Sequence, residues 1–368
     1  MTTIEPETLA EQIQRDSPYI LDIRHEEEYT DWNIPGSVNI DVYDQLDADP
    51  ELAKPALSEI PSDEEVVTVC AAGVLSQDAT TVLEDLGYDV KTLVDGMNGW
   101  SRVHRSAEVE VDVEGTLVQV TRPGKGCLSY VLVSDGEAAV FDPSQYVSEY
   151  VAILEEYDAS LVGVFDTHAH ADHLSGGREL ADAHDVQYFL HPDDALGIDA
   201  TDVEDEDVHT IGEVEVTVVH TPGHSEGGVT YSIEGDALLT GDTLFHESVG
   251  RVELGVEAGI EDTSIEENAA TLYESLQRIR DRAADPLILP SHDPGSPEPP
   301  VAVRLQEVVE RNADLDRDRD EFVSILASDV PDHPPNFQRV KAVNVGRETV
   351  DESDRASIEL GPNRCAAE

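Results

Sequence analysis

Five histidines and two aspartates stand just beyond the ends of four predicted strands. Three of the histidines and one aspartate fall within six residues, in the order His-Ala-His-Ala-Asp-His. Imidazole and carboxylate groups together suit a divalent zinc or iron ion. Because loops on a rigid scaffold commonly build active sites, the pattern predicts a metal site. Its candidate residues are His168, His170, Asp172, His173, His224, Asp242 and His292.

The strands that would position these residues are read from short apolar runs that end in polar loops. The four that end at a candidate ligand are Ser160–Asp166, Val214–His220, Ala237–Thr240 and Pro286–Pro290. Other strands are expected at Thr116–Arg122, Cys127–Ser134, Ala138–Asp142 and Val229–Ile233, with helices at Ile265–Ala284 and Pro300–Asn312. Sheets covered by helices in this order predict an α+β domain folded as an αββα sandwich.

A second candidate for chemistry is Cys70, in the first part of the chain. It ends the predicted strand Val66–Cys70 and precedes the helix Ser76–Leu86, which Gly87 terminates. Backbone N–H groups and a helix N-terminus aimed at a sulfur lower its pKa and stabilise anions on it. Residues 1 to about 106 alternate strands and helices, so an α/β domain with a parallel sheet is expected there.

Other reactive residues have simpler interpretations. Asp22 and Arg24, at the end of a strand, are expected to form a structural ion pair rather than to act in catalysis. Cys127 lies in an apolar strand and is interpreted as a core residue, whereas Cys365 is unassigned. Three cysteines at unrelated spacings indicate a reducing compartment without a disulfide framework.

The composition excludes several classes of protein. Among 368 residues, 22 are Lys or Arg and 80 are Asp or Glu, giving a net charge of −58. Nucleic-acid phosphates need basic patches that such a chain cannot assemble, and no apolar stretch is long enough for a membrane span. An acidic, lysine-poor surface repels itself in dilute salt but stays hydrated in concentrated salt. We therefore expect a cytoplasmic protein with a halophilic surface and neither nucleic-acid nor membrane partners.

Residues 112–346 resemble the metallo-β-lactamase superfamily through the motifs T-H-A-H-A-D-H at 167–173, T-P-G-H at 221–224, G-D-T at 241–243 and the late His292. Two families within it compete. Hydroxyacylglutathione hydrolases, of the glyoxalase II group, use two zinc ions to hydrolyse a thioester. Persulfide dioxygenases use one iron(II) to oxidise a glutathione-type persulfide to sulfite.

Three features favour the resemblance to the dioxygenases. Gly228 stands where the hydrolases usually carry a second histidine. The segment Val330–Gly346 resembles the dioxygenases' C-terminal closing segment, and Arg251 stands where they place a substrate-facing arginine. Two positions near the thiol carrier depart from that family, at Pro294 and at Asn312-Ala313-Asp314. These departures concern the identity of the carrier more than the chemistry.

Residues 1 to about 105 resemble the rhodanese family. The resemblance rests on the loop Cys70-Ala71-Ala72-Gly73-Val74-Leu75-Ser76, with Leu75 in place of the family's usual arginine, which removes a donor for thiosulfate. The chain is thus divided into a rhodanese-like domain at 1–106, a linker at 107–111, a metallo-β-lactamase-like domain at 112–346 and a charged C-terminal tail at 347–368, expected to be frayed.

These resemblances imply a two-domain sulfur enzyme. His168, His224 and Asp242 would hold one Fe(II), with His170, Asp172, His173 and His292 around it or on a second metal. Cys70 would exchange sulfane sulfur, and Arg251 would bind substrate. The implied partners are a low-molecular-weight thiol persulfide, O₂, and sulfite or thiosulfate, and a homo-oligomer is compatible with the sequence. Two alternatives stay open: a thioester hydrolase with two Zn ions, and a non-catalytic sulfur-relay module.

Overall fold

The computed structural model describes residues 2–15, 18–61, 65–282, 284–292, 299–328 and 330–366. They form two compact units. The first comprises residues 1–104 with the short segments 122–125 and 360–362, and the second comprises 105–121, 126–359 and 363–368. The short segments show that a strand turn and part of the C-terminal region contribute to the first unit.

The first unit is a five-stranded parallel sheet with helices packed on it. The strand order is β1-β5-β4-β2-β3, and every pair is parallel. The strands are β1 Thr2–Ile4, β2 Tyr19–Asp22, β3 Val38–Asn39, β4 Val66–Val69 and β5 Val90–Leu93. The helices are α1 Pro6–Arg15, α2 Glu26–Asp31, α3 Tyr43–Ala48, α4 Lys54–Leu57, α5 Leu75–Leu86 and α6 Gly96–Trp100, with a 3₁₀ turn at Pro50–Ala53. This confirms the predicted α/β class.

Two apolar clusters lie on opposite faces of this sheet. Val66 belongs to a cluster with Leu83 of α5, whereas its neighbour Val67 packs with Leu9 of α1. Successive side chains of a strand point to opposite faces, so a strand buried on both sides reads as a continuous apolar run. That is why these strands could be recognised in the sequence.

The second unit contains two sheets, of seven and six strands. The first has the order β12-β11-β10-β9-β8-β7-β6, and the second runs β13-β14-β15-β16-β17-β18. The strands of the first sheet are β6 Arg105–Val109, β7 Thr116–Arg122, β8 Cys127–Ser134, β9 Glu137–Phe141, β10 Ser160–Phe165, β11 Gln187–Leu190 and β12 Thr201–Asp202. Those of the second are β13 Val208–Ile211, β14 Val214–His220, β15 Val229–Ile233, β16 Ala237–Gly241, β17 Leu287–Pro290 and β18 Val303–Arg304.

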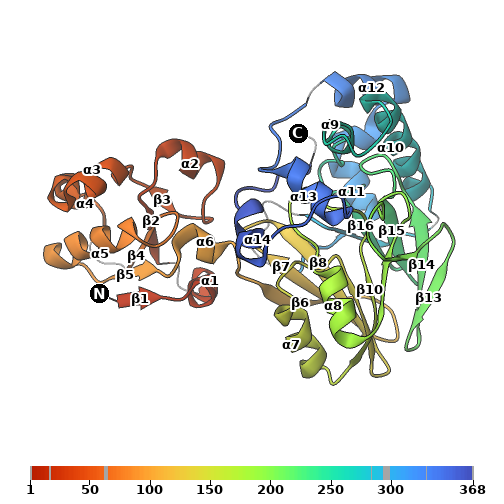
Figure 1. Cartoon of the computed structure of the whole chain (residues 1–368), viewed down its shortest axis with the longest axis horizontal. Helices are drawn as coiled ribbons and strands as arrows, with labels where there is room; N and C mark the ends of the chain where they lie inside the picture. Colours follow the sequence, from red (N-terminus) through yellow and green to blue (C-terminus); the bar gives the residue numbers. More distant parts are fainter. Residues whose placement is uncertain are drawn as a thin grey trace. The chain divides into compact units, whose positions relative to one another are not determined.

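Helices cover the outer faces of both sheets, which completes the predicted αββα sandwich (Figure 1). A central cluster including Tyr130 and Tyr231 joins the inner faces. Helices α7 Ser148–Glu156 and α8 Gly177–His184 cover the seven-stranded sheet. The six-stranded sheet is covered by α10 Ile265–Arg280, α11 Leu305–Arg311 and α12 Arg319–Ser328. The remaining helices are α9 Leu254–Glu257, α13 Phe337–Asn344 and α14 Glu352–Ile358, with a 3₁₀ turn at Ala313–Asp316.

Three segments differ from their predicted form. The linker predicted at 107–111 overlaps the edge strand β6, whose residues pair with β7 in antiparallel register. The helix expected at Pro300–Asn312 begins only at Leu305, because Val303 and Arg304 pair with β17. The C-terminal segment is not frayed: it carries α14, and Ile358 and Cys365 are buried. The many charged residues of this segment led to the wrong prediction, because its buried apolar residues are few.

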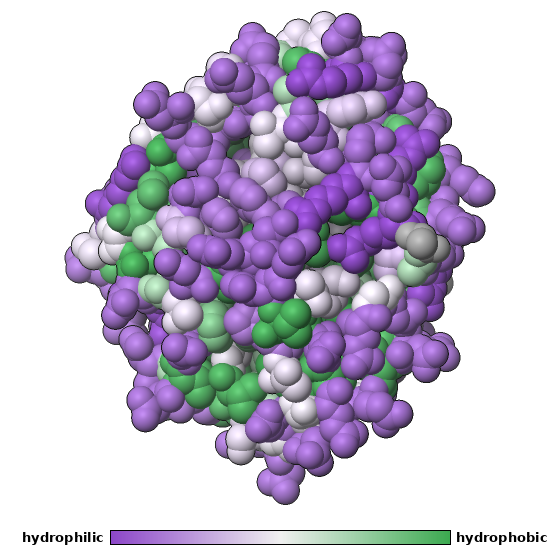
Figure 2. All heavy atoms as spheres, turned by 90° about the vertical axis from the view of Figure 1, so that its right-hand side faces the viewer, coloured by the Kyte–Doolittle hydropathy of each residue, from purple (hydrophilic) through white to green (hydrophobic). Residues whose placement is uncertain are grey.

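The surface agrees with the acidic composition. The face seen in Figure 2 is covered mainly by hydrophilic side chains, with hydrophobic ones scattered between them. No helix within the described residues is long and apolar enough to cross a membrane.

Candidate metal centre and cysteine loop

The seven candidate ligands come together where four strands end. Segment 167–173 follows β10, His224 follows β14, Asp242 follows β16 and His292 follows β17. All seven are at most 3% exposed. Gly241 has a φ of +56°, and a Cβ there would lie 2.7 Å from the Thr167 hydroxyl oxygen. Glycine at this position therefore allows the loop after β16 to approach the loop after β10.

His168, His224 and Asp242 form a group whose ligand atoms lie within 4.8 Å of one another. Asp242 Oδ2 is 3.7 Å from His168 Nε2 and 3.6 Å from His224 Nε2. Within the described part of the chain, none of these three buried atoms has a hydrogen-bond partner. Buried polar atoms without a partner are costly, so their convergence fits a bound metal ion.

The Nδ1 atoms of His168 and His224 each have a hydrogen-bonding partner. His224 Nδ1 donates to the Arg251 carbonyl oxygen at 2.8 Å, and His168 Nδ1 is 2.9 Å from the Thr167 hydroxyl. Such contacts fix the ring and its tautomer, leaving Nε2 free to bind a metal. Burial, with the neighbouring imidazoles His170 and His224, holds the pKa of His168 well below its ordinary value, and burial also lowers the pKa of His224. Both rings are therefore in the neutral, metal-binding form.

A different set is formed by Asp172, His173 and His292, together with Cys127. The Cys127 sulfur lies 3.3 Å from Asp172 Oδ2 and 3.6 Å from His173 Nδ1. His173 Nδ1 is 3.0 Å from Asp172 Oδ1, and His292 Nε2 is 2.9 Å from Asp172 Oδ2. The interpretation of Cys127 as a core residue is therefore incomplete: it is buried, but its sulfur belongs to this polar cluster.

His292 connects the two sets. Its Nδ1 is 2.5 Å from Asp242 Oδ1, while its Nε2 contacts Asp172. Asp242 therefore directs one carboxylate oxygen toward His168 and His224 and the other toward the His292 ring. One oxygen of this carboxylate is therefore shared with an imidazole.

The His170 ring packs against both sets, with its centroid 4.2 Å from that of His168 and 4.3 Å from that of His173. Its Nε2 is 3.3 Å from Asp142 Oδ1, and it groups with Asp142 and Asp166. Burial raises the pKa of Asp166 to about 6, and Ser175 donates a 2.5 Å hydrogen bond to it. The structure thus divides the predicted ligands: three form an open group, three form a group with Cys127, and His170 groups with Asp142 and Asp166.

The segment Val330–Gly346, expected to close the site, contacts the loop at 167–173 directly. The Asn344 amide donates to the carbonyl oxygens of His170 and His173, both at 2.8 Å. The Lys341 ammonium is fully buried and donates to the Ala169 carbonyl oxygen at 3.2 Å. These contacts from α13 hold the metal-binding loop in place.

Arg251, which was predicted to bind substrate, is surrounded by protein groups. Although it borders the cavity described below, it is only 1% exposed and forms an ion pair with Glu253. Its remaining N–H groups donate to the carbonyl oxygens of Pro331, Asp332 and Arg364. These contacts occupy the guanidinium in this structure and hold residues 331–332 and 364 against it.

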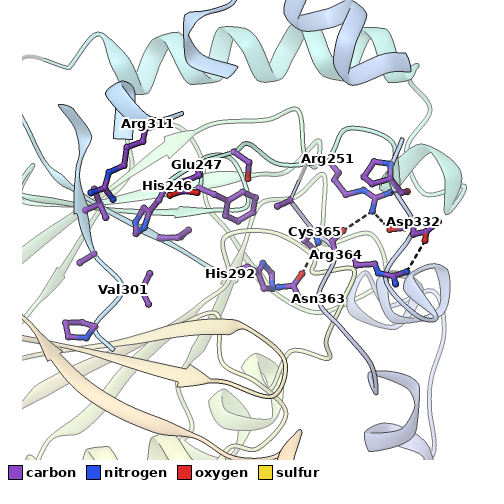
Figure 3. A pocket seen from close by; sticks show the side chains of 18 of the residues that line it. His246, Glu247, Arg251, His292, Val301, Arg311, Asp332, Asn363, Arg364 and Cys365 are labelled. Atoms are coloured by element: carbon purple, nitrogen blue, oxygen red, sulfur yellow. Dashed lines mark hydrogen bonds and ion pairs between the residues drawn. The ribbon is translucent and has the colours of Figure 1, made fainter. Parts of the chain in front are cut away.

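A cavity of about 1010 Å³ opens beside His292. His292 and Cys365 lie on its wall in Figure 3, as do Asn363 and Arg364.

Asn312, one of the positions that depart from the dioxygenase pattern, is buried and donates to the Ser248 carbonyl oxygen at 2.8 Å. Pro294, the other departure, lies outside the described residues.

The Cys70 loop in the first unit is held by its own neighbours. The Cys70 sulfur accepts a 3.4 Å hydrogen bond from the Ser76 amide, and its carbonyl oxygen accepts one from Met97 N at 2.9 Å. A Cβ on Gly96 would lie 2.0 Å from that carbonyl oxygen, so only glycine fits there. Leu75, at the start of α5, is partly buried against the core and offers no donor to an anion.

Asp22 and Arg24 form the predicted structural pair. The Arg24 guanidinium is 2.7 Å from Asp22 Oδ2, and both side chains are buried. Arg24 also donates to the Trp32 carbonyl oxygen at 2.5 Å. This pair fixes the chain after β2.

Comparison with known proteins agrees with both units. Residues 5–103 match the rhodanese-like domain family, and residues 122–292 match the metallo-beta-lactamase superfamily. The chain therefore consists of a rhodanese-like domain followed by a metallo-β-lactamase domain.

Individual relatives each match part of the chain. A hydroxyacylglutathione hydrolase from Rhodospirillum rubrum is 32% identical over 174 residues, 46% of this chain and 62% of that protein. ETHE1 from Myxococcus xanthus has a TM-score of 0.53 and 25% identity, covering 62% of this chain and 98% of its own. A metallo-beta-lactamase from Staphylococcus aureus has a TM-score of 0.58 and 24% identity, covering 65% and 75%, and supports the fold alone. The chain thus spans less than two thirds of the hydrolase, but nearly all of ETHE1.

Three residues near the metal centre were missed or unassigned by sequence reasoning. Cys127 and Cys365 both lie within ligand distance of His292, and Lys341 supports the metal-binding loop. Only the rarity of lysine, at four residues in the chain, could have drawn attention to Lys341. Nothing in the local sequence of either cysteine indicated its position.

Proposed function

We propose that this protein is an iron-dependent persulfide dioxygenase joined to a rhodanese domain. The metal-dependent domain would oxidise a low-molecular-weight thiol persulfide with O₂ and water, giving the thiol and sulfite. The rhodanese domain would exchange sulfane sulfur among thiosulfate, sulfite and persulfide through Cys70.

One observation carries the proposal: the open group contains two histidines and one carboxylate, His168, His224 and Asp242. Two histidines and one carboxylate with open positions are typical of non-haem iron(II) oxygenases. His170, which would make a third histidine, is instead 3.3 Å from Asp142. Asp242 Oδ1 is held by His292, so a bridged pair of zinc ions is not favoured.

The ligands present fit iron(II), which when bound supplies the redox chemistry that lets O₂ react with a sulfane sulfur. The protein's own residues orient this site. Arg251 O fixes the His224 ring through Nδ1, and Asn344 holds the loop that carries His168. The cavity beside His292 would admit the persulfide.

Coupling of the two domains follows from their products. Sulfite released by the second domain can take the outer sulfur of a persulfide on Cys70, giving thiosulfate and the free Cys70 thiol; the reverse reaction breaks the same S–S bond. The Ser76 amide and the start of α5 would stabilise the sulfur anion that leaves or attacks.

The test is oxygen consumption by iron-loaded protein supplied with glutathione persulfide. We expect O₂ uptake with sulfite as product, and about one iron per chain at full activity. Hydrolysis of a hydroxyacyl thioester without oxygen uptake would replace the proposal with the zinc hydrolase, the activity named in the Rhodospirillum rubrum relative.

A further inference from the structure

The two loops that carry His168 and His224 are both bound to one buried carboxylate, that of Asp194. This residue lies shortly after β11, which pairs with β10 in parallel register. Because neighbouring parallel strands end at the same edge of a sheet, the chain after β11 reaches the loop after β10. Asp194 is only 1% exposed, and it belongs to none of the ligand groups found among the described residues.

The Asp194 carboxylate accepts hydrogen bonds from both loops, in each case from the residue that follows a proposed ligand. The Ala169 amide, directly after His168, donates to Oδ2 at 2.6 Å. The Ser225 hydroxyl, directly after His224, lies 2.6 Å from Oδ1 and 2.8 Å from Oδ2. An ionised carboxylate offers only acceptors to these donors, whereas an amide side chain would present a donor to one of them.

The glycine at position 227 allows this close approach. The Gly227 amide donates to Asp194 Oδ1 at 3.3 Å, and a Cβ on Gly227 would lie only 2.8 Å from Asp194 Cγ. Any side chain there would push the loop after β14 away from the carboxylate. The loop that carries His224 is therefore packed directly on Asp194.

Lys341 of α13 contacts the same two residues with the opposite charge. Its buried ammonium donates to the Ala169 carbonyl oxygen at 3.2 Å and to the Ser225 hydroxyl oxygen at 3.3 Å. An anion thus accepts from the N–H of Ala169 while a cation donates to its C=O, and the Ser225 hydroxyl contacts both charged groups. Hydrogen bonds to ionised groups are roughly twice as strong as neutral ones, so these contacts fix both loops.

We propose that Asp194, together with Lys341, is a positioning residue that sets the spacing of His168 and His224 and thereby the metal affinity of the open group. This inference rests on the proposed iron site, because it is the backbone beside those two histidines that the charged pair holds. Loss of a group that orients metal ligands typically weakens metal binding by roughly 10- to 100-fold. Asp194 therefore acts on the metal through the two loops and not as a ligand.

Asp193 provides a matched control, because it is the neighbouring aspartate in the same segment. Its side chain is 57% exposed, and its carboxylate lies 3.6 Å from His191 Nδ1. Asp193→Asn and Asp194→Asn remove the same charge one residue apart. Only the second replaces the shared acceptor of Ala169 and Ser225, so the two variants separate positioning from a general effect of charge.

The experiment measures iron(II) affinity by anaerobic competition with a chromogenic iron(II) chelator. The iron that His224→Ala fails to hold defines the open group. Asp194→Asn should weaken its affinity for iron roughly tenfold or more, Ser225→Ala should weaken it less, and Asp193→Asn should match the parent. Because Asp194 and Lys341 act on the same peptide and hydroxyl, the losses in Asp194→Asn and Lys341→Met should not multiply in the double variant.

Thermal unfolding of the metal-free variants distinguishes positioning from a purely structural role. A lower melting temperature with unchanged iron affinity in Asp194→Asn would overturn the proposal, as would an equal loss of affinity in Asp193→Asn or a parent that holds no more iron than His224→Ala. If Asp194→Asn does not fold, Ser225→Ala provides the same test by removing a single hydroxyl. Failure of the proposed function has a different signature: the parent consumes no oxygen with a persulfide but still binds iron more tightly than Asp194→Asn.

Discussion

The cysteine loop and the metal centre are built in opposite ways. Cys70 and the groups around its sulfur lie within one strand–loop–helix unit, and the hydrogen-bonding Ser76 is six residues away. The metal centre takes its ligands from loops after four strands, and Asp172 and His292 meet across 120 residues of sequence. A local site is fixed by local backbone geometry, whereas a dispersed site depends on the registration of two complete sheets.

This difference affects how each site responds to change. Substitution in the cysteine loop should alter one site only. The effect of a substitution at the metal centre should reach several ligands, because they share hydrogen-bonding partners. His292 contacts both Asp172 and Asp242, and the Arg251 carbonyl oxygen holds His224.

The largest effect is expected for Asp242→Ala. It removes the one carboxylate of the open group, so bound iron and oxygen uptake with a persulfide should both be lost. Metal analysis and an oxygen electrode measure this. Asp205→Ala, which changes an exposed aspartate paired with Arg278, is the control and should keep both. Full iron occupancy in Asp242→Ala would show that the ligand assignment is wrong.

The next prediction separates the two sites. Cys70→Ser should abolish sulfur transfer between thiosulfate and a thiol, because no persulfide can form on the serine oxygen. Oxygen uptake with a supplied persulfide should stay near the parent value, since His168, His224 and Asp242 are unchanged. Both rates are measured on one preparation. If both fell in folded, iron-loaded protein, the division into two independent sites would be mistaken.

Arg251→Gln should destabilise the second unit while the first is unaffected. It leaves the buried Glu253 carboxylate unpaired and removes hydrogen bonds to three carbonyl oxygens, a loss on the order of 3 kcal/mol. Trp32 and Trp100 both lie in the first unit, so tryptophan fluorescence follows that unit during urea unfolding.

Circular dichroism, which also sees the second unit, should show an earlier transition in Arg251→Gln at an unchanged fluorescence midpoint. Arg311→Gln is the control: its pair with Glu307 is about half exposed, so its loss should change stability by less than about 1 kcal/mol. Equal shifts in both signals would mean that the two units unfold together.

The smallest expected effect is an increase in thiosulfate turnover. Leu75→Arg restores a cationic donor at the start of α5, and a guanidinium can hold an anion through two hydrogen bonds. Thiosulfate turnover should rise roughly tenfold, equivalent to about 1.4 kcal/mol. Leu75→Gln, similar in length but uncharged, should give less than half of that gain. No increase in Leu75→Arg would show that the missing arginine does not limit this site.

Much of the architecture could be predicted from the sequence because it is written in local patterns. Buried parallel strands such as β4 and β10 appear as short apolar runs, and α5 shows helical spacing ended by Gly87, which has a φ of +92°. The edge strand β6 was missed because its half-exposed, charged residues carry no such signal.

The sequence alone determined which residues could bind a metal, since His168, His224, Asp242 and their neighbours all follow predicted strands. Only the tertiary structure decided how they are divided. It turned His170 toward Asp142, placed the Cys127 sulfur beside Asp172, and saturated Arg251 with carbonyl oxygens. The physical reason is that residue type and spacing specify what a side chain can bind, whereas its partners depend on contacts between segments far apart in the chain.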